Sequence, residues 1–319
     1  MDGSGDHVKT DSVEERHTLV GLGEVLWDVL PNGKQLGGAP ANFAYHAQAL
    51  GGNGIVVSCV GDDGPGREIL ARLDDLGLDR RYVATDKNHP TGTVTVELDA
   101  VGKPAYTIHE NVAWDYIPYN SGLEELAGEV DAVCFGSLCQ RSRVSRETIR
   151  QFLEVTKREC LRLFDLNLRQ SYFNREIIDT LLKLTDVLKL NDEELPFLAE
   201  LCDVQGSETR VLHQLTERYA LRLVALTRAE RGSRLFTPGR DSDHPGFRAQ
   251  VADTVGAGDS FAAVLALGLL RGEQLDRINE YANRVASFVC SQNGATPPLP
   301  SELIKIPGEI KSAESLMRD

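Results

Sequence analysis

The sequence predicts an α/β protein in which helices cover both faces of a doubly wound, mostly parallel β-sheet. Short β-rich runs alternate with amphipathic helical runs along most of the chain. The strand runs are largely apolar, which is typical of parallel strands that are buried on both faces. Two other stretches carry hairpin turns or alternate with period two, and they predict a small antiparallel sheet beside the main one.

The expected elements of the main sheet and its helices follow one another from the N-terminus. The run HTLVGLGEVLWDVL over 17–30 is rich in apolar β-formers and predicts the first strand. The first helix, over 42–51, ends at a Gly-Gly pair, and glycine commonly ends helices. The same reasoning predicts strands over 54–61, 131–137, 161–167, 186–191 and 221–227, and helices over 66–77, near 145–159, near 175–184, within 192–219 and from the glycines at 256–258 to about Leu270.

The small sheet is expected to form a lid. Residues 30–38 contain a Pro-Asn-Gly turn where a hairpin would reverse, and residues 91–111 alternate with period two around a Gly-Lys-Pro turn. A flap of this kind over the strand ends could close on a ligand. We expect a single domain over 18–305 that carries this lid, with terminal extensions over 1–17 and 306–319.

Composition excludes several classes of partner. The net charge of −14 argues against nucleic acid or an anionic membrane, because both attract basic surfaces. Backbone N–H groups can still hold a phosphate on an acidic protein. No apolar run is long enough to span a bilayer and the first twenty residues lack an apolar signal core, so we expect a cytoplasmic protein. The six scattered cysteines favour buried thiols over disulfides or zinc.

The segment DTVGAGDSF over 253–261 carries the strongest chemical signal. Gly256, Ala257 and Gly258 lead into an apolar helical run, whose first turn offers unpaired N–H groups and the positive end of the helix dipole. That arrangement suits charge that develops on a transferring phosphoryl group. Asp259 would repel a phosphate, which favours a role as the base that deprotonates an attacking hydroxyl. The alternative is an acidic residue that only complements the dipole.

Two motifs resemble those of the ribokinase-like (PfkB) carbohydrate kinases. DTVGAGDSF resembles the C-terminal motif of that family, and GGAPANFAYHAQALGG over 37–52 resembles its N-terminal motif. The similarity covers about residues 18–300 and implies a ribokinase-like fold with a β lid. It implies a kinase that uses ATP and Mg²⁺, with Asp259 as the base and the Gly256–Gly258 backbone stabilising the transition state.

The same resemblance implies a sugar site at the first strand end. Family members hold sugar hydroxyls with an Asp and a Gly-Gly-x-x-x-Asn segment, which here correspond to Asp28, Gly37, Gly38 and Asn42. Carboxylate and amide groups suit vicinal hydroxyls, and glycine lets the backbone approach the ring. A helix N-cap is the alternative interpretation of Asn42. In FDLNLRQ over 164–170, Arg169 would reach the phosphate or the sugar, or form only a surface ion pair.

Further motifs resemble the family's nucleotide and cation sites. Asn191 and Glu194 in NDEE match an N-x-x-E element that organises Mg²⁺ through water, although a capping box is an equally simple interpretation. LTRAERGS over 226–233 resembles the T-x-G-x-x-G nucleotide loop, with Ala229 in place of the first glycine. This replacement argues against a close backbone approach there, although alanine can follow most backbone paths with negative φ. The remaining implied residues are Thr227 and Gly232 in that loop, Asn283 beside the adenine or ribose, Gly258 at the nucleotide phosphates, and Asp253 in a loop for a monovalent cation such as K⁺.

The substrate is the least determined part of the expectation. Tyr106 and His109 lie in the flap, and His109 stands where ketodeoxygluconate kinases typically carry an Arg for the substrate carboxylate. Lack of that charge favours a neutral sugar, and the opening GEVLWDVLP resembles bacterial fructokinases, so D-fructose is the first choice. Ribose, ketodeoxygluconate and nucleoside kinases remain open, as does a non-catalytic sensor of sugars or nucleotides. The exposed lid edges also allow a homodimer through the lid.

Overall fold

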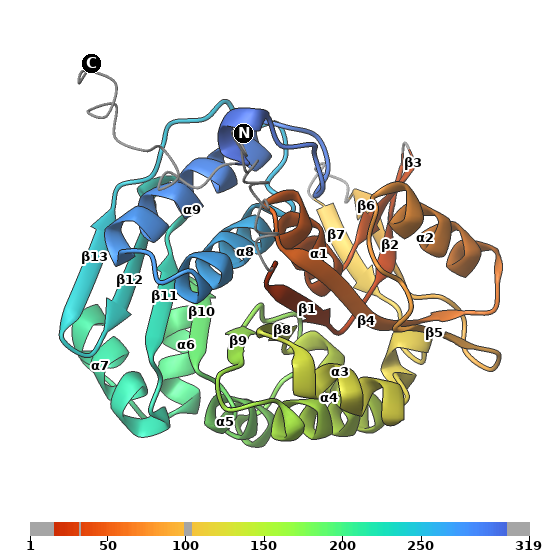
Figure 1. The fold of residues 1–319 in the computed structure, drawn as a ribbon, viewed down its shortest axis with the longest axis horizontal. Helices are drawn as coiled ribbons and strands as arrows, with labels where there is room; N and C mark the ends of the chain where they lie inside the picture. The colour runs from red at the N-terminus through yellow and green to blue at the C-terminus, as the bar shows by residue number, and fades with distance from the viewer. Residues whose placement is uncertain (1–15, 32, 99–103, 305–319) are drawn as a thin grey trace, which may run out of the picture.

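A nine-stranded sheet forms the centre of the molecule (Figure 1). The computed structural model describes residues 16–31, 33–98 and 104–304. The strand order is β13-β12-β11-β10-β9-β8-β1-β4-β5, and all pairs are parallel except the last two at the β13 edge. The strands are β1 (Thr18–Leu22), β4 (Asn53–Gly61), β5 (Val83–Asp86), β8 (Ala132–Gly136), β9 (Leu161–Asp165), β10 (Val187–Asn191), β11 (Leu223–Thr227), β12 (Ser233–Thr237) and β13 (Arg240–His244).

Helices cover both faces of this sheet, as the apolar strand runs predict. Alternate strand residues contribute to two separate cores, since Leu19 packs in one and Val20 in the other. One face carries α1 (Ala39–Ala49), α8 (Ala257–Leu270) and α9 (Leu275–Cys290), and the other carries α3 (Ser121–Glu129), α4 (Arg143–Val155), α5 (Arg175–Lys183), α6 (Glu194–Leu201) and α7 (Glu208–Tyr219). The helix α2 (Gly64–Asp75) packs against β4, which neighbours the edge strand β5. The predicted α/β fold class is confirmed.

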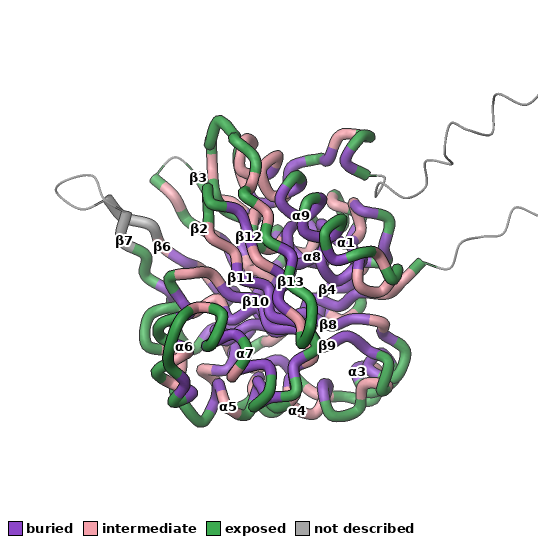
Figure 2. Tube along the Cα trace, turned by 90° about the vertical axis from the view of Figure 1, so that its left-hand side faces the viewer, coloured by how far each residue is buried: buried purple, intermediate pink, exposed green. Residues whose placement is uncertain are grey.

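A four-stranded lid projects from this domain, in the order β3-β2-β6-β7. Its strands are β2 (Leu26–Leu30), β3 (Gly33–Gly37), β6 (Thr93–Leu98) and β7 (Pro104–Ile108). Both predicted hairpins form, and the Pro-Asn-Gly and Gly-Lys-Pro turns lie partly outside the described residues. The central pair β2–β6 is parallel, because both strands leave the same edge of the main sheet. Figure 2 shows the lid carrying exposed residues while the main sheet is buried.

The predicted first strand over 17–30 is wrong as a single element, because the chain leaves the main sheet in its middle. Gly23 still bonds to β4 through its N–H, at 3.0 Å from the Val57 oxygen, and then turns with a φ of 151°. The N–H of Trp27 already bonds to Gly92 at the start of the lid. The run therefore supplies β1 to the main sheet and β2 to the lid, with a turn between the two strands.

The helix α8 is apolar on all sides and lies centrally, in contact with α1, α9 and the sheet. Residues Ser260–Gly268 are buried without exception, and the predicted end at about Leu270 is confirmed. A helix in this position presents its first turn to the edge where the parallel strands end. None of the helices in the described part of the chain is both long enough and apolar enough to cross a membrane.

Candidate functional site

The start of α8 forms a strained turn that only glycine tolerates. Gly256 caps the helix with a φ of 81°, and a Cβ atom there would lie 2.4 Å from the Ala295 carbonyl oxygen. Backbone so close to another segment requires a glycine. The N–H groups of the first turn have no partner within the helix, and the dipole adds positive potential at this point. The turn is therefore suited to an anionic group.

Asp259 lies in this first turn and contacts Asn42 on α1, the helix that follows the lid strand β3. The Asn42 side chain donates a hydrogen bond from Nδ2 to Asp259 Oδ2 at 2.8 Å. Burial and the charge of Asp165 raise the pKa of Asp259 to about 6, against the lowering effects of Asn42 and Lys189. A carboxylate with a pKa near neutrality is well matched to proton abstraction.

Asn42 is not the N-cap of its helix. Gly38 holds that place in α1, and Asn42 lies one turn inside it. The capping interpretation is therefore wrong. Its Oδ1 atom is buried without a partner while Nδ2 binds Asp259, so the amide oxygen remains available to a ligand hydroxyl.

A buried ion pair beside Asp259 was not foreseen from the sequence. Lys189 on β10 donates from Nζ to both carboxylate oxygens of Asp165 at the end of β9, each at 2.9 Å. A Cβ on Gly258 would lie 3.3 Å from the same Nζ, so the ammonium group adjoins the first turn of α8. The signal in the sequence was a lysine inside the apolar strand run DVLKLN, in step with Asn191 two residues later.

Asn191 and Glu194 bind each other's backbone in a reciprocal arrangement. Asn191 Oδ1 accepts from the Glu194 N–H at 2.8 Å, and Glu194 Oε2 accepts from the Asn191 N–H at 2.9 Å. The capping interpretation is thus confirmed. Glu194 Oε1 also accepts from the Leu168 N–H at 2.8 Å, which ties the end of β9 to this helix start. Each carboxylate oxygen keeps a further lone pair for a water molecule.

The lid end of the site brings Asp28 against a bare backbone. A Cβ on Gly37 would lie 2.2 Å from Asp28 Oδ2, and one on Gly38, whose φ is 110°, would lie 2.3 Å from the Glu24 oxygen. Neither position has room for a side chain. Burial raises the pKa of Asp28 to about 6, although Arg169 lowers it. The Asp28 carboxyl group and the Glu24 carbonyl oxygen thus lie directly against this glycine backbone.

Arg169 is electrostatically coupled to three carboxyl groups of this region, those of Glu24, Asp28 and Asp259. It also donates to the Leu168 oxygen at 3.1 Å.

The flap residues are less closely engaged. Tyr106 is 59% exposed, and His109 Nε2 lies 2.9 Å from Thr95 Oγ1 within the lid.

The nucleotide-loop residues lie along the neighbouring strand ends. Thr227 donates to the Leu190 oxygen at 3.3 Å, and Gly232 has a φ of 77° with a Cβ position 2.0 Å from the His244 oxygen. Asn283 lies inside the protein, since its Nδ2 donates to Ser233 Oγ at 2.7 Å and it is 7% exposed. Its amide nitrogen therefore links α9 to β12.

Asp253 closes a loop near the start of α8. Its Oδ1 accepts from the Val255 N–H at 3.0 Å, and its Oδ2 accepts from the Gly294 N–H at 3.1 Å. The first bond is the local turn expected for this residue type. The second fixes the segment that carries the Ala295 carbonyl against Gly256. No group of three or more His, Cys, Asp or Glu side chains suited to a metal ion occurs within 16–31, 33–98 and 104–304.

Comparison with known proteins matches the sequence of this chain to one family. The profile described as pfkB family carbohydrate kinase covers residues 10–302. The chain belongs to this family. A fructokinase of Klebsiella pneumoniae is 32% identical over 260 residues, which cover 78% of this chain and 83% of that protein. Fructokinase-1 of Oryza sativa is 27% identical over 311 residues, or 89% and 95% of the two chains.

Solved structures of pfkB-like kinases share the fold. An uncharacterised sugar kinase of Pyrococcus horikoshii in complex with ATP aligns with a TM-score of 0.75 and 28% identity, over 88% of this chain and 94% of that one. A fructokinase of Xylella fastidiosa with bound ATP aligns with a TM-score of 0.79 and 21% identity, over 90% and 97% of the two chains.

Ala229 departs from the loop pattern of the pfkB family in a strained way. Alanine can follow most backbone paths with negative φ, but Ala229 has a φ of 49°. The short 3₁₀ turn Ala229–Arg231 leads directly into Gly232, and tight packing of Gly232 against β13 holds the turn in place. A left-handed alanine costs roughly 1–2 kcal/mol relative to ordinary backbone conformations.

Replacing Ala229 by glycine is therefore expected to raise the free energy of unfolding by up to about 1 kcal/mol, since glycine's greater freedom in the unfolded chain cancels part of the relief. Urea unfolding measures the change. The control Ala286→Gly, inside α9, should lose roughly 0.5–1 kcal/mol. A loss of similar size in Ala229→Gly would contradict the strain.

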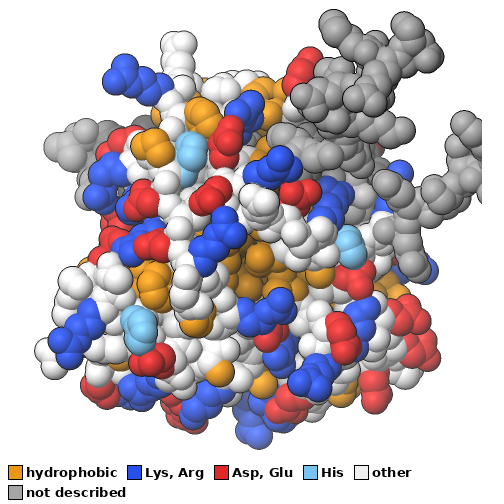
Figure 3. Space-filling view, turned by 60° about the vertical axis from the view of Figure 1, so that its left-hand side comes forward, with side chains coloured by type: hydrophobic (Ala, Val, Ile, Leu, Met, Phe, Trp, Pro, Cys, Tyr) orange, Lys and Arg blue, Asp and Glu red, His pale blue; other side chains and the backbone are white. Residues whose placement is uncertain are grey.

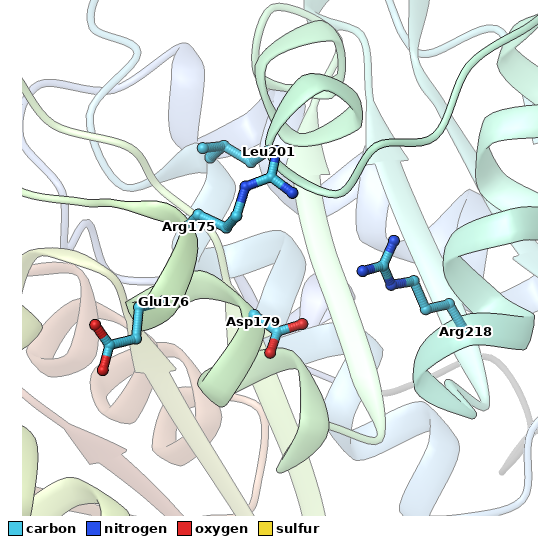
Figure 4. Close-up of a pocket in the computed structure, with 5 residues that line it drawn as sticks. All are labelled: Arg175, Glu176, Asp179, Leu201 and Arg218. Atoms are coloured by element: carbon cyan, nitrogen blue, oxygen red, sulfur yellow. The ribbon is translucent and has the colours of Figure 1, made fainter.

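A hollow between α5, α6 and α7 contains none of the residues of the candidate site. Figure 4 shows Asp179 between Arg175 and Arg218 in this hollow. These groups already have protein partners: Arg175 binds Asp203 at 2.9 Å, Arg218 donates to the Cys202 oxygen, and Asp179 accepts from Tyr219 at 3.0 Å. On the face in Figure 3, basic and acidic side chains are interspersed.

Proposed function

We propose that the protein transfers the γ-phosphate of ATP to D-fructose and forms fructose 6-phosphate. The observation that carries the proposal is the position of Asp259, in the anion-binding first turn of α8 and in hydrogen-bond contact with Asn42. This position would bring together a base, backbone N–H groups for the transferring phosphoryl group and the residues proposed to bind the sugar. The fructokinase names of relatives at 27–32% identity support the choice of sugar. ATP-bound structures of related kinases support the choice of donor.

In the proposed reaction, Asp259 accepts the proton of the 6-hydroxyl as its oxygen attacks the γ-phosphorus and the bond to the β-phosphate oxygen breaks. The backbone N–H groups at Gly256–Gly258 stabilise the negative charge on the transferring group. Lys189 adjoins the same turn and adds positive charge there. Asp28, the Gly37–Gly38 backbone, Asn42 and Arg169 would hold the sugar hydroxyls, with Tyr106 and His109 above them in the lid.

The residues present fit a water-mediated Mg²⁺ site and not a direct protein cage. Mg²⁺ usually keeps several waters and uses one or two carboxylates together with substrate phosphates. Glu194 has both carboxylate oxygens fixed by backbone N–H groups, so it would orient metal-bound waters. When bound, Mg²⁺ would neutralise charge on the β- and γ-phosphates. Asn191, Thr227 and Gly232 would line the nucleotide side, with Asn283 supporting the loop from within and Asp253 shaping a loop for K⁺.

A sugar panel tests the proposed acceptor. ADP release is measured with D-fructose, D-ribose, ketodeoxygluconate and adenosine, each with and without K⁺. D-fructose is expected to give the highest kcat/KM. The flap has His109 at the position where an Arg would bind a substrate carboxylate, so a neutral sugar is favoured. A different preferred acceptor would reassign the substrate within the family. Absence of turnover with every acceptor would favour the sugar- or nucleotide-sensing alternative and contradict the kinase proposal.

Two further parts of the proposal concern its setting. A cytoplasmic location is supported by six cysteines without disulfides and by the need for ATP. A homodimer through the lid is supported by exposed Val29 and Tyr106 on lid strands. Light scattering of the full chain would decide between monomer and dimer.

The raised pKa of Asp259 gives the proposed reaction an acid limb. A general base works only when it is deprotonated, and the pKa of Asp259 lies at about 6, above its usual range. We expect kcat at saturating D-fructose and ATP to level off above about pH 6 and to fall about tenfold per pH unit below it. Chromatographic measurement of ADP across this range tests the expectation. A kcat that stays constant well below pH 6 would contradict it.

A further inference from the structure

A buried carboxyl group without a partner lies where the chain passes from the main sheet to the lid. Glu24 lies two residues after the end of β1 and is 3% exposed, and its Oε2 atom is buried with no hydrogen-bond partner. Burial raises the pKa of Glu24 to about 7, although its own backbone, Arg169 and Arg141 lower it. An unpaired buried carboxylate lowers the stability of the folded protein, so its presence suggests a role in function.

A matching unpaired donor lies on the neighbouring element. Arg141 ends the short 3₁₀ turn Leu138–Arg141 after β8, and its Nη1 atom is buried without a partner. Its other nitrogens are engaged, Nε with Asp115 at 2.8 Å and Nη2 with Asp115 at 2.9 Å and the His109 oxygen at 2.6 Å. The Trp114 and Tyr172 rings lie 4.0 Å and 4.8 Å from the guanidinium carbon. The guanidinium is thus fixed, and the nitrogen Nη1 is left without a partner.

These two groups belong to the site already described. The strands β1 and β8 are adjacent in the sheet and parallel, so the segments that follow them leave from the same edge. The Glu24 carboxyl interacts electrostatically with Arg141, with Arg169 and with Asp259. The backbone of Glu24 also adjoins Gly38. A buried acceptor and a buried donor, each without a hydrogen-bond partner, therefore lie on segments that leave the same edge of the sheet.

The chemistry of the pair selects one kind of ligand group. A hydroxyl both donates and accepts, so it can bond to the carboxylate and to the guanidinium at once. A carboxylate or phosphate on the ligand would face the charge of Glu24, and an apolar group would leave both atoms unpaired. We propose that Glu24 and Arg141 bind a hydroxyl group of the acceptor sugar other than the phosphorylated one, and so determine which sugar is accepted. The inference rests on the proposed function and adds two binding residues to it.

Deoxy sugars test this directly. The full-length protein and its Glu24→Met variant are assayed with ATP and with 1-, 3- and 4-deoxy-D-fructose beside D-fructose. Wild type is expected to discriminate against one of these analogues by at least about 100-fold in kcat/KM, since a site built to bond a hydroxyl rejects its absence strongly. Glu24→Met is expected to raise the KM for D-fructose at least about tenfold, to lose most of that discrimination, and to leave the KM for ATP unchanged.

Two control variants separate binding from structure. Glu24→Gln keeps hydrogen-bonding capacity and should retain part of the discrimination. Glu125→Met changes an exposed carboxylate on α3 and should alter neither KM. Glu24→Met should unfold at an equal or higher urea concentration than wild type, because it removes a buried unpaired charge. A structural or water-bridging role would instead lower stability and leave sugar discrimination intact.

The outcomes distinguish this inference from the function on which it rests. If wild type uses another sugar of the panel, the fructose assignment fails, and Glu24 is tested with the deoxy forms of that sugar. An unchanged KM and unchanged discrimination in Glu24→Met overturn the inference while the kinase activity stands. If no sugar is phosphorylated, both fail together.

Discussion

Replacing Asp259 by asparagine is expected to lower kcat by at least about 100-fold, because the general base is lost while the geometry of the first turn of α8 is kept. Asparagine can still accept the hydrogen bond that Asn42 donates at 2.8 Å. The amides at Gly256–Gly258 are unaffected. The dissociation constants for ATP and for D-fructose should remain within about threefold of the wild-type values. The shift in unfolding temperature that each ligand causes measures them.

The stability of Asp259→Asn provides a second readout. Burial raises the pKa of Asp259 above its unfolded value, so ionisation above about pH 6 costs folding free energy. The sign follows directly: the folded protein holds the proton more tightly, and the penalty is absent at low pH and present near neutral pH. The variant should therefore be at least as stable as wild type near pH 7. The surface variant Asp75→Asn should leave both kcat and stability unchanged. Near-normal turnover in Asp259→Asn would refute its assignment as the base.

Replacing Lys189 by methionine is expected to cost roughly 3–5 kcal/mol of stability, because Asp165 would be left buried without its cation. It should also lower turnover, since positive charge beside Gly258 would be lost. Lys189 lowers the pKa of Asp259, so the acid limb of kcat should move to higher pH in this variant. Urea unfolding and the pH profile of kcat measure the two effects.

Removing the partner as well separates ion-pair loss from packing. The double variant Lys189→Met with Asp165→Asn should regain much of the stability, because no unpaired charge remains buried. Its acid limb should return toward lower pH, because Asp165 raises the pKa of Asp259. The surface control Lys183→Met, which removes an exposed pair with Asp179, should cost no more than about 1 kcal/mol. A double variant as unstable as Lys189→Met alone would contradict the ion-pair explanation.

Much of the fold follows from local pattern. The apolar strand runs and the all-apolar run of α8 determine which segments are buried, and burial on both faces requires helices on both sides. Gly256 and Gly258 favour a tight turn before the apolar run, so an acidic side chain in the first turn of a buried helix could be predicted from nine residues. The two-sided sheet then brings α1 and α8 together, which accounts for the contact between Asn42 and Asp259.

Other features depend on contacts that no local pattern reveals. The strand β13 has the sequence RDSDH, whose polar residues suit an exposed edge and carry no strand signal. At Gly23 the chain passes from β1 in the main sheet to β2 in the lid. Both strands bury apolar residues, so the sequence shows one continuous apolar run and no sign of the break. The ion pair between Lys189 and Asp165 joins neighbouring strands 24 residues apart. The positive φ at Ala229 and the unpaired atoms of Glu24 and Arg141 appear only when every neighbour is placed.

The rate of phosphoryl transfer in a single turnover, measured by rapid quench across the pH range around 6, tests the central claim most directly. Wild type with ATP, Mg²⁺ and D-fructose should transfer the phosphoryl group about tenfold more slowly per pH unit below about pH 6, and Asp259→Asn should be at least about 100-fold slower on the plateau with little dependence on pH. An acid limb of the same position and slope in both proteins would show that a group other than Asp259 accepts the proton.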